Sequence, residues 1–327
     1  MNLKKKRIVV TGGAGFLGRW VVEALKKRGA ENVFVPRSKQ YDLREKAAIE
    51  KLFADTKPEI ILHLAAVVGG IGANREHPGK FFYDNAIMGI QLLESARAHG
   101  VEKIVNIGTI CMYPKFTPVP FKEAELWNGY PEETNAPYGL AKKMLLVQGQ
   151  AYRDEYGVNA ITLLPTNLYG PGDNFDLETS HVVPALIRKC VEAKESGKKE
   201  VTLWGDGSAT REFLYVGDAA EGIVLATEHF DGRDPVNLGR KEEVSIKRLA
   251  ETIAKLVGFR GTIQWDKTKP NGQPRRMVDT TAAKKFFGFE AKTTLESGLK
   301  AMIQWFLENR MLSVPAQPES LTDTTSF

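Results

Sequence analysis

The stretch Thr11-Gly12-Gly13-Ala14-Gly15-Phe16-Leu17-Gly18 decides the fold of this chain. The apolar run at 8–10 precedes it and predicts a short buried strand, and residues 16–27 continue as an amphipathic helix. The first glycine of the spaced set at 12, 15 and 18 permits a tight turn. The second lets a pyrophosphate approach the backbone, and the third lets the helix pack on the strand. Strand, turn and helix N-terminus together predict a dinucleotide site rather than a merely structural glycine turn.

Apolar runs and helical patterns then alternate along the first half of the chain. Buried strands are predicted at 8–10, 33–35, 60–64, 104–107 and 160–164, and helices at 16–28, 45–54, 83–99 and 138–156. This alternation is typical of an α/β fold, a Rossmann-type doubly wound parallel sheet with helices on both faces. Later helices are expected at 182–194, at 245–257 with Ser245 as N-cap, and at 299–307.

The rhythm breaks after Pro165, which suggests a division into two parts. We expect residues 1–166 to form the dinucleotide-binding Rossmann domain, with segments from about 211–240 returning to it. Residues 167–312 are expected to form mainly a smaller α/β substrate-binding lobe. The polar tail at 313–327 has a composition typical of disorder.

Composition narrows the class of protein. The 327 residues are 43% hydrophobic and 26% charged, as in ordinary soluble globular chains. A net charge of +5 suits anionic small molecules, and no RNA-binding motif or groove-reading helix suggests nucleic acid as a partner. The two cysteines, Cys111 and Cys190, suggest neither a metal site nor a disulfide framework. No apolar run approaches 18 residues and no signal-peptide pattern is present, so we expect a cytoplasmic protein without a membrane segment.

Tyr138 and Lys142 carry the first sign of catalysis. They are four residues apart in a predicted helix, so both side chains lie on one face and the ammonium can reach toward the phenol. A nearby ammonium is expected to lower the pKa of the phenol toward a range useful for proton transfer. The alternative is a surface tyrosine with a solvated lysine, and the glycine turn upstream favours the catalytic interpretation.

The residues after the second predicted strand report on the cofactor. The segment Val35-Pro36-Arg37-Ser38-Lys39 has two bases and no acid, which favours NADP(H), because a base accepts the 2′-phosphate. Asp42 and Leu43 follow where an adenine could rest. The small alanines of His63-Leu64-Ala65-Ala66 allow a dinucleotide to pass close to the backbone.

The glycine turn and the Tyr138-to-Lys142 spacing resemble the extended short-chain dehydrogenase/reductase superfamily, over the chain to about residue 310. Within it, the chain resembles the GDP-L-fucose synthase family. The segments that carry this resemblance are 68–71, Cys111-Met112-Tyr113-Pro114-Lys115, 165–171, 173–175, 180–186, Trp204-Gly205 and Arg211-Glu212-Phe213.

The resemblance implies an NADP-dependent oxidoreductase that is also an epimerase and acts on GDP-4-keto-6-deoxy-mannose. It assigns Thr109, Tyr138 and Lys142 to the reductase triad, with Cys111 as the base and His181 as the acid of 3,5-epimerisation. The implied cofactor residues are Gly12, Gly15, Phe16, Leu17, Gly18, Arg37, Asp42, Leu43, Ala65, Lys142, Pro165, Asn167 and Leu168. The implied substrate residues are Asn167, His181, Val182, Lys189, Trp204 and Arg211. A homodimer is also implied, and no metal.

The chain departs from the family pattern at three positions. Thr109 stands where a serine is usual and keeps the hydroxyl. Ala14 replaces an arginine that can help to hold a 2′-phosphate, which counts against NADP. Lys189 replaces an arginine, which keeps the charge but loses bidentate geometry.

The proposed roles raise two chemical questions. A free thiol has a pKa of about 8.5, so Cys111 needs help to act as a base. Residue 181 follows Ser180 at a predicted helix start, where the dipole favours neutral imidazole over the protonated acid.

Other functions stay open. A related enzyme acting on another GDP-keto-sugar, of the deoxyheptose or colitose type, fits the same residues, and a simple nucleotide-sugar 4-epimerase is a further alternative. A 4,6-dehydratase is disfavoured, because Ile110 and Cys111 stand where an Asp-Glu pair is expected. A non-catalytic dinucleotide sensor is expected to have a damaged triad, whereas the triad here is intact.

Overall fold

The computed structural model describes residues 1–269 and 273–310. The predicted disordered tail at 313–327 lies outside these residues. No helix in the described part of the chain is both long and apolar enough to cross a membrane.

The main sheet confirms the predicted α/β fold class. Its described strands are all parallel and run in the order β2-β1-β3-β4-β5-β9. Their bounds are β1 Arg7–Thr11, β2 Asn32–Phe34, β3 Ile60–His63, β4 Lys103–Ile107, β5 Ala160–Pro165 and β9 Val236–Leu238. The chain order reverses between β1 and β3, and at such a point the carboxyl ends of the strands leave a crevice for a ligand.

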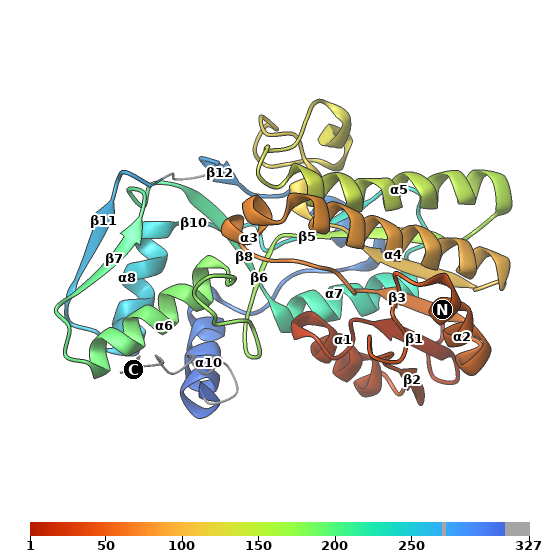
Figure 1. Ribbon diagram of the computed structural model, residues 1–327, viewed down its shortest axis with the longest axis horizontal. Helices are drawn as coiled ribbons and strands as arrows, with labels where there is room; N and C mark the ends of the chain where they lie inside the picture. The colour runs from red at the N-terminus through yellow and green to blue at the C-terminus, as the bar shows by residue number, and fades with distance from the viewer. Residues whose placement is uncertain (270–272, 311–327) are drawn as a thin grey trace, which may run out of the picture.

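Helices cover both faces of this sheet (Figure 1). On one side lie α1 Phe16–Lys27, α7 Val216–His229 and α9 Thr281–Phe287; on the other lie α2 Lys46–Thr56, α4 Pro78–Ala98 and α5 Ala136–Tyr156, with the short α3 Ile71–Glu76 beside α4. Successive strand side chains point to opposite faces. Ile8 and Val10 therefore join the core under α1 and α7, whereas Val9 joins the core under α2 and α4.

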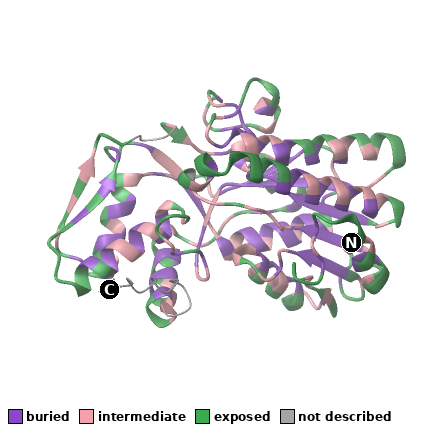
Figure 2. Ribbon diagram, in the orientation of Figure 1, coloured by how far each residue is buried: buried purple, intermediate pink, exposed green. Residues whose placement is uncertain are grey.

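A second lobe is built around β8 Thr210–Tyr215. This strand pairs with β6 Asn167–Tyr169 and β12 Arg275–Arg276 in parallel and with β10 Glu243–Ser245 antiparallel. The remaining elements are the parallel pair β7 Glu200–Trp204 and β11 Thr262–Asp266, and the helices α6 Val182–Glu195, α8 Ile246–Val257 and α10 Leu295–Glu308. Buried segments run through both lobes in Figure 2, so each has its own core.

Several expectations are refined by the structure. Ser245 caps α8 as predicted, since its hydroxyl accepts a hydrogen bond from the Arg248 amide at 3.1 Å. Helix α4 begins at Pro78, five residues before the predicted start. Within the stretch expected to return to the first domain, α7 packs on α1 and β9 extends the main sheet, but β8 belongs to the second sheet. The expectation is wrong for β8 because local pattern does not reveal which partner strand receives its hydrogen bonds.

Candidate active site

A cavity of about 1490 Å³ runs from the glycine turn to the second lobe. Ordinary small-molecule pockets measure about 300–1,000 Å³, so this one has room for more than one ligand. Every predicted site residue lines it: Gly12, Gly15, Phe16, Leu17, Gly18, Arg37, Asp42, Leu43, Ala65, Thr109, Cys111, Tyr138, Lys142, Pro165, Asn167, Leu168, His181, Val182, Lys189, Trp204 and Arg211.

The glycine turn leaves room only for backbone. Gly12 has a φ of +70°, and a Cβ there would lie 2.7 Å from the Ala65 nitrogen. A Cβ on Gly18 would lie 2.1 Å from the Gly12 carbonyl oxygen. Helix α1 begins after Gly15, which has no side chain to occupy the first amides. Those amides fit the pyrophosphate of a dinucleotide.

The far end of the cofactor region carries a charged pair that we did not predict. Arg44 binds Asp42 through two hydrogen bonds, Nε to Oδ1 at 3.0 Å and Nη2 to Oδ2 at 2.7 Å, and thereby lowers the pKa of Asp42 to about 2. Arg37 is exposed at the cavity edge, whereas Lys39 is not among the described residues that line it. Of the two predicted bases, Arg37 is therefore the one placed to meet a 2′-phosphate.

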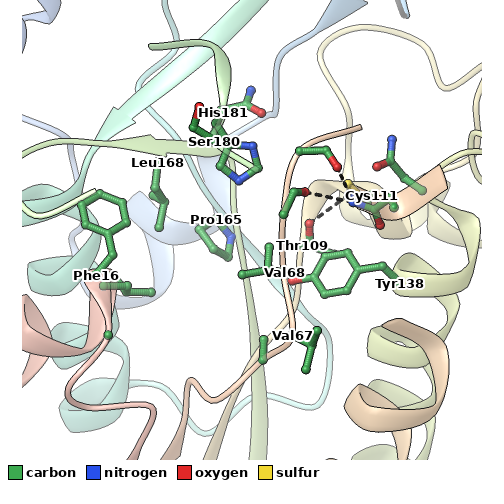
Figure 3. Close-up of a pocket in the computed structure, with 18 of the residues that line it drawn as sticks. Phe16, Val67, Val68, Thr109, Cys111, Tyr138, Pro165, Leu168, Ser180 and His181 are labelled. Carbon is green, nitrogen blue, oxygen red and sulfur yellow. Dashed lines mark hydrogen bonds between the residues drawn. The ribbon is translucent and has the colours of Figure 1, made fainter. Parts of the chain in front are cut away.

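Thr109 and Cys111 are held together by a short turn after β4. The Thr109 hydroxyl accepts a hydrogen bond from the Cys111 amide at 3.2 Å and so caps the 3₁₀ turn η1, Ile110–Met112. A Cβ on Gly139 would lie 2.2 Å from the Cys111 carbonyl oxygen. Helix α5 can therefore pack directly against this turn, which brings Tyr138 to the same side of the cavity as Thr109 and Cys111 (Figure 3).

The electrostatics of the Tyr138–Lys142 pair differ from expectation. Burial lowers the pKa of Lys142 to about 8. Burial, and next the charge of Cys111, raise the pKa of Tyr138 above its ordinary value. The expected lowering of the phenol pKa is wrong for this structure, because burial penalises the charged phenolate.

His63, at the end of β3, is a buried imidazole to which sequence reasoning gave no role. Its Nδ1 lies 2.9 Å from the Thr11 hydroxyl, and its Nε2 has no hydrogen-bond partner among the described residues. Burial, and next the charge of Lys142, lower the pKa of His63 to about 3.

His181 faces the thiol from the opposite side of the cavity, directly before α6 (Figure 3). Its ring is open to the cavity but otherwise surrounded by protein, and this desolvation lowers its pKa below the ordinary value. The direction agrees with the neutral imidazole expected at a helix start.

The second lobe lines the rest of the cavity with polar and aromatic groups. Burial, and next the charge of Arg276, lower the pKa of Arg211 to about 10. The neighbouring Glu212 is buried and accepts backbone hydrogen bonds from Arg240, Lys241 and Val278 at 2.5, 2.7 and 2.9 Å. These bonds fix β8 and with it the direction of Arg211.

Some lining residues were not predicted, among them Asn74, Glu132, Asn135, Ser180, Gln273 and Arg276. Arg276 is the most informative, because its Nη1 lies 4.0 Å from the sulfur of Cys111. No local signal reveals it, since β12 has only two residues and its pairing with β8 is a tertiary feature.

Comparison with known proteins adds three findings. The profile of the family described as "NAD dependent epimerase/dehydratase family" matches residues 8–239. GDP-L-fucose synthase 1 of Arabidopsis thaliana is 40% identical over 309 residues, 94% of this chain and 95% of that protein. GDP-L-colitose synthase of Yersinia pseudotuberculosis is 38% identical over 306 residues, 93% of this chain and 99% of that one.

A solved structure has the same arrangement over almost the whole chain. The GDP-L-fucose synthetase of Naegleria fowleri bound to NADP superposes with a TM-score of 0.89 at 30% identity. The match covers 96% of this chain and 98% of that one.

Proposed function

The chain belongs to the NAD dependent epimerase/dehydratase family, and from this premise we propose that it converts GDP-4-keto-6-deoxy-mannose to GDP-L-fucose. The reaction comprises epimerisation at C3 and C5 and NADPH-dependent reduction at C4. The proposal rests on one observation above all. A thiol and an imidazole face one another across a cavity that also holds the Thr109–Tyr138–Lys142 set.

Epimerisation needs a base and an acid on opposite faces of the sugar. The C4 ketone acidifies the hydrogens on C3 and C5, so the thiolate of Cys111 can take a proton and leave an enolate. Tyr138 and Thr109 donate hydrogen bonds to the C4 oxygen, where the negative charge develops. His181 takes up a proton from solvent and gives it to the other face, which inverts the centre, and the Cys111 thiol then returns its proton to solvent before the second centre reacts.

Reduction then uses the same phenol as an acid. NADPH, when bound, supplies the hydride to C4. Tyr138 gives its proton to the C4 oxygen, and its raised pKa keeps that proton in place until it is needed. Lys142 stays mostly protonated at neutral pH, since its pKa of about 8 is above 7, so it can stabilise the phenolate that remains.

The preference for NADP(H) has two supports. Arg37 follows β2 at the cavity edge with no acid beside it, and the structural relative from Naegleria fowleri binds NADP. Ala14 removes one further base that could contact the 2′-phosphate.

The decisive experiment offers the purified chain NADPH with GDP-4-keto-6-deoxy-mannose. We expect NADPH oxidation, followed at 340 nm, and a GDP-L-fucose product identified by nuclear magnetic resonance. The matched substrate is the corresponding 3,6-dideoxy sugar, because a colitose synthase is similarly close in sequence. Turnover of the dideoxy sugar alone would overturn the substrate assignment, and epimerisation at C4 without net NADPH oxidation would favour a simple 4-epimerase.

We also propose that the chain forms a homodimer through α4 and α5 and acts in the cytoplasm. The two helices lie side by side and expose Phe82, Tyr83, Met144 and Val147. Cys111 and Cys190 are both free, and a cysteine that acts as a base must remain reduced, which suits a reducing compartment.

A further inference from the structure

The thiol of Cys111 lies next to a cation that comes from a distant part of the chain. Arg276 Nη1 approaches the Cys111 sulfur at 4.0 Å, although 165 positions separate the two residues. Both are half-buried and both line the cavity. A guanidinium at this distance favours the thiolate over the neutral thiol, because opposite charges attract strongly where water is partly excluded.

Two hydrogen bonds tie Arg276 to the segment that carries Cys111. Arg276 Nε donates to the Gln273 side-chain oxygen at 2.6 Å, and the Gln273 amide nitrogen donates to the Lys115 carbonyl at 2.6 Å. Lys115 follows Cys111 in the same loop. The loop that carries Cys111 therefore also orients the guanidinium that contacts the Cys111 sulfur.

The charge of Arg276 is not neutralised by a carboxylate. Its neighbour Arg275 binds Glu243, with Nη2 2.6 Å from Oε2, whereas no ion pair within residues 1–269 and 273–310 involves Arg276. Arg276 also lies opposite Arg211 in the register of β12 and β8. Two adjacent guanidinium groups favour a negative charge beside them, and the sulfur of Cys111 lies next to one of the two.

We propose that Arg276 is the positioning residue that makes Cys111 a base, by stabilising its thiolate before the sugar binds. The role of Cys111 as the base of epimerisation rests on the proposed function. Cys111 first releases its proton to solvent. The thiolate then forms an S–H bond as the C–H bond at C3 or C5 breaks, and the electron pair of that bond moves into the enolate on the C4 oxygen.

Other charged and titratable groups share the cavity with Cys111. Tyr138 and Lys142 come from α5, Glu132 from the loop before it, and His181 and Arg211 from the opposite lobe. Arg276 differs from them in contacting the sulfur itself. It is therefore the group whose removal is expected to change the ionisation of the thiol most.

The test measures alkylation of Cys111 by iodoacetamide as a function of pH in the full chain, with the modified residue identified by mass spectrometry. Arg276→Met is expected to react about tenfold more slowly at pH 7 and to reach its half-maximal rate about one pH unit higher. Arg276→Lys is expected to restore most of the rate. The matched control Arg275→Met removes the adjacent exposed arginine and is expected to keep the parent profile.

A second variant protects the test against misfolding of the first. Gln273→Leu removes the hydrogen bond that orients the guanidinium but keeps its charge. We expect alkylation of Cys111 at pH 7 to slow by about threefold. The proposal is overturned if Arg276→Met and Gln273→Leu both keep the parent pH profile. Alkylation needs no sugar nucleotide, so this outcome is distinct from failure of the proposed function, which is a parent chain that leaves NADPH unoxidised. In the turnover reaction, Arg276→Met is expected to move the pH profile of deuterium exchange at C3 and C5 by the same unit.

Discussion

Cys111 and Tyr138 line the same cavity, but in the proposed reaction Cys111 acts only in epimerisation whereas Tyr138 is the proton donor of the reduction, so their variants are expected to affect the two steps unequally. Cys111→Ser replaces the base with a hydroxyl that stays protonated at neutral pH. We expect solvent deuterium incorporation at C3 and C5 to fall at least about a hundredfold. Tyr138→Phe removes the proton donor of the reduction, so NADPH oxidation is expected to fall by a similar factor while exchange falls by about tenfold or less. Nuclear magnetic resonance of the recovered sugar and absorbance at 340 nm measure the two rates.

Both variants need to be shown to be folded and loaded. Thermal unfolding with and without NADPH supplies that control, since a bound ligand raises the apparent stability of the folded state. Unchanged exchange in Cys111→Ser would contradict the assignment of the base.

The buried His63 is expected to make the free energy of unfolding depend on pH in the acid range. Its pKa in the folded chain is about 3, below the ordinary value near 6.5. Between these two values the unfolded chain binds a proton that the folded chain does not, so the free energy of unfolding falls as the pH falls. From pH 6 to pH 5 this residue alone is expected to remove about 1 kcal/mol.

Chemical denaturation of the parent and of His63→Gln across pH 5 to 7 measures this contribution. Glutamine keeps a polar group near the Thr11 hydroxyl but does not titrate, so its unfolding free energy is expected to depend less on pH by that amount. His229→Gln serves as the control, because His229 is an exposed residue in the last turn of α7. Equal pH slopes in the parent and in His63→Gln would rule out a neutral His63 as the cause.

At the scale of elements, sequence patterns predicted what is local and missed what is tertiary. Strands β1 to β5 and helices α1, α5, α6 and α8 lie within a few residues of their predicted bounds, because each has its own apolar period or cap. The glycine turn and the Tyr138-to-Lys142 spacing are likewise local patterns. The cofactor and reductase residues predicted from them line one cavity.

The short strands of the second lobe could not be predicted in the same way. Strands β6, β10 and β12 have two or three residues each, too few to show a period of two, and they exist because β8 offers them partners. For the same reason the sequence could not predict that Arg276 lies beside Cys111, since the position of Arg276 follows from the register of β12 on β8. The sign of the Tyr138 pKa shift was also missed, because sequence gives the spacing of two charges but not the burial that opposes them.

At the scale of the whole molecule, the cavity depends on two lobes that fold around separate cores. The first lobe supplies the glycine turn, Tyr138 and Lys142, and the second lobe supplies His181, Arg211 and Arg276. Along the described residues the chain passes from one lobe to the other after β5, after β8, after β9, after β12 and after α9. Epimerisation and reduction can therefore share one sugar position only while both lobes hold their relative places.

Helices α4 and α5 lie side by side on the first lobe (Figure 1). They carry the exposed apolar residues of the proposed dimer. Tyr83 is 61% exposed and Val147 48% exposed, which is costly for apolar side chains that face water but favourable in an interface. Light scattering after gel filtration is expected to give twice the 36.3 kDa mass of one chain. Val147→Glu is expected to shift the chain to the monomer, because it places a charge where apolar surface is to be buried. The control Leu307→Glu changes an equally exposed residue on α10 and is expected to leave the dimer intact, whereas a monomeric parent chain would refute the interface.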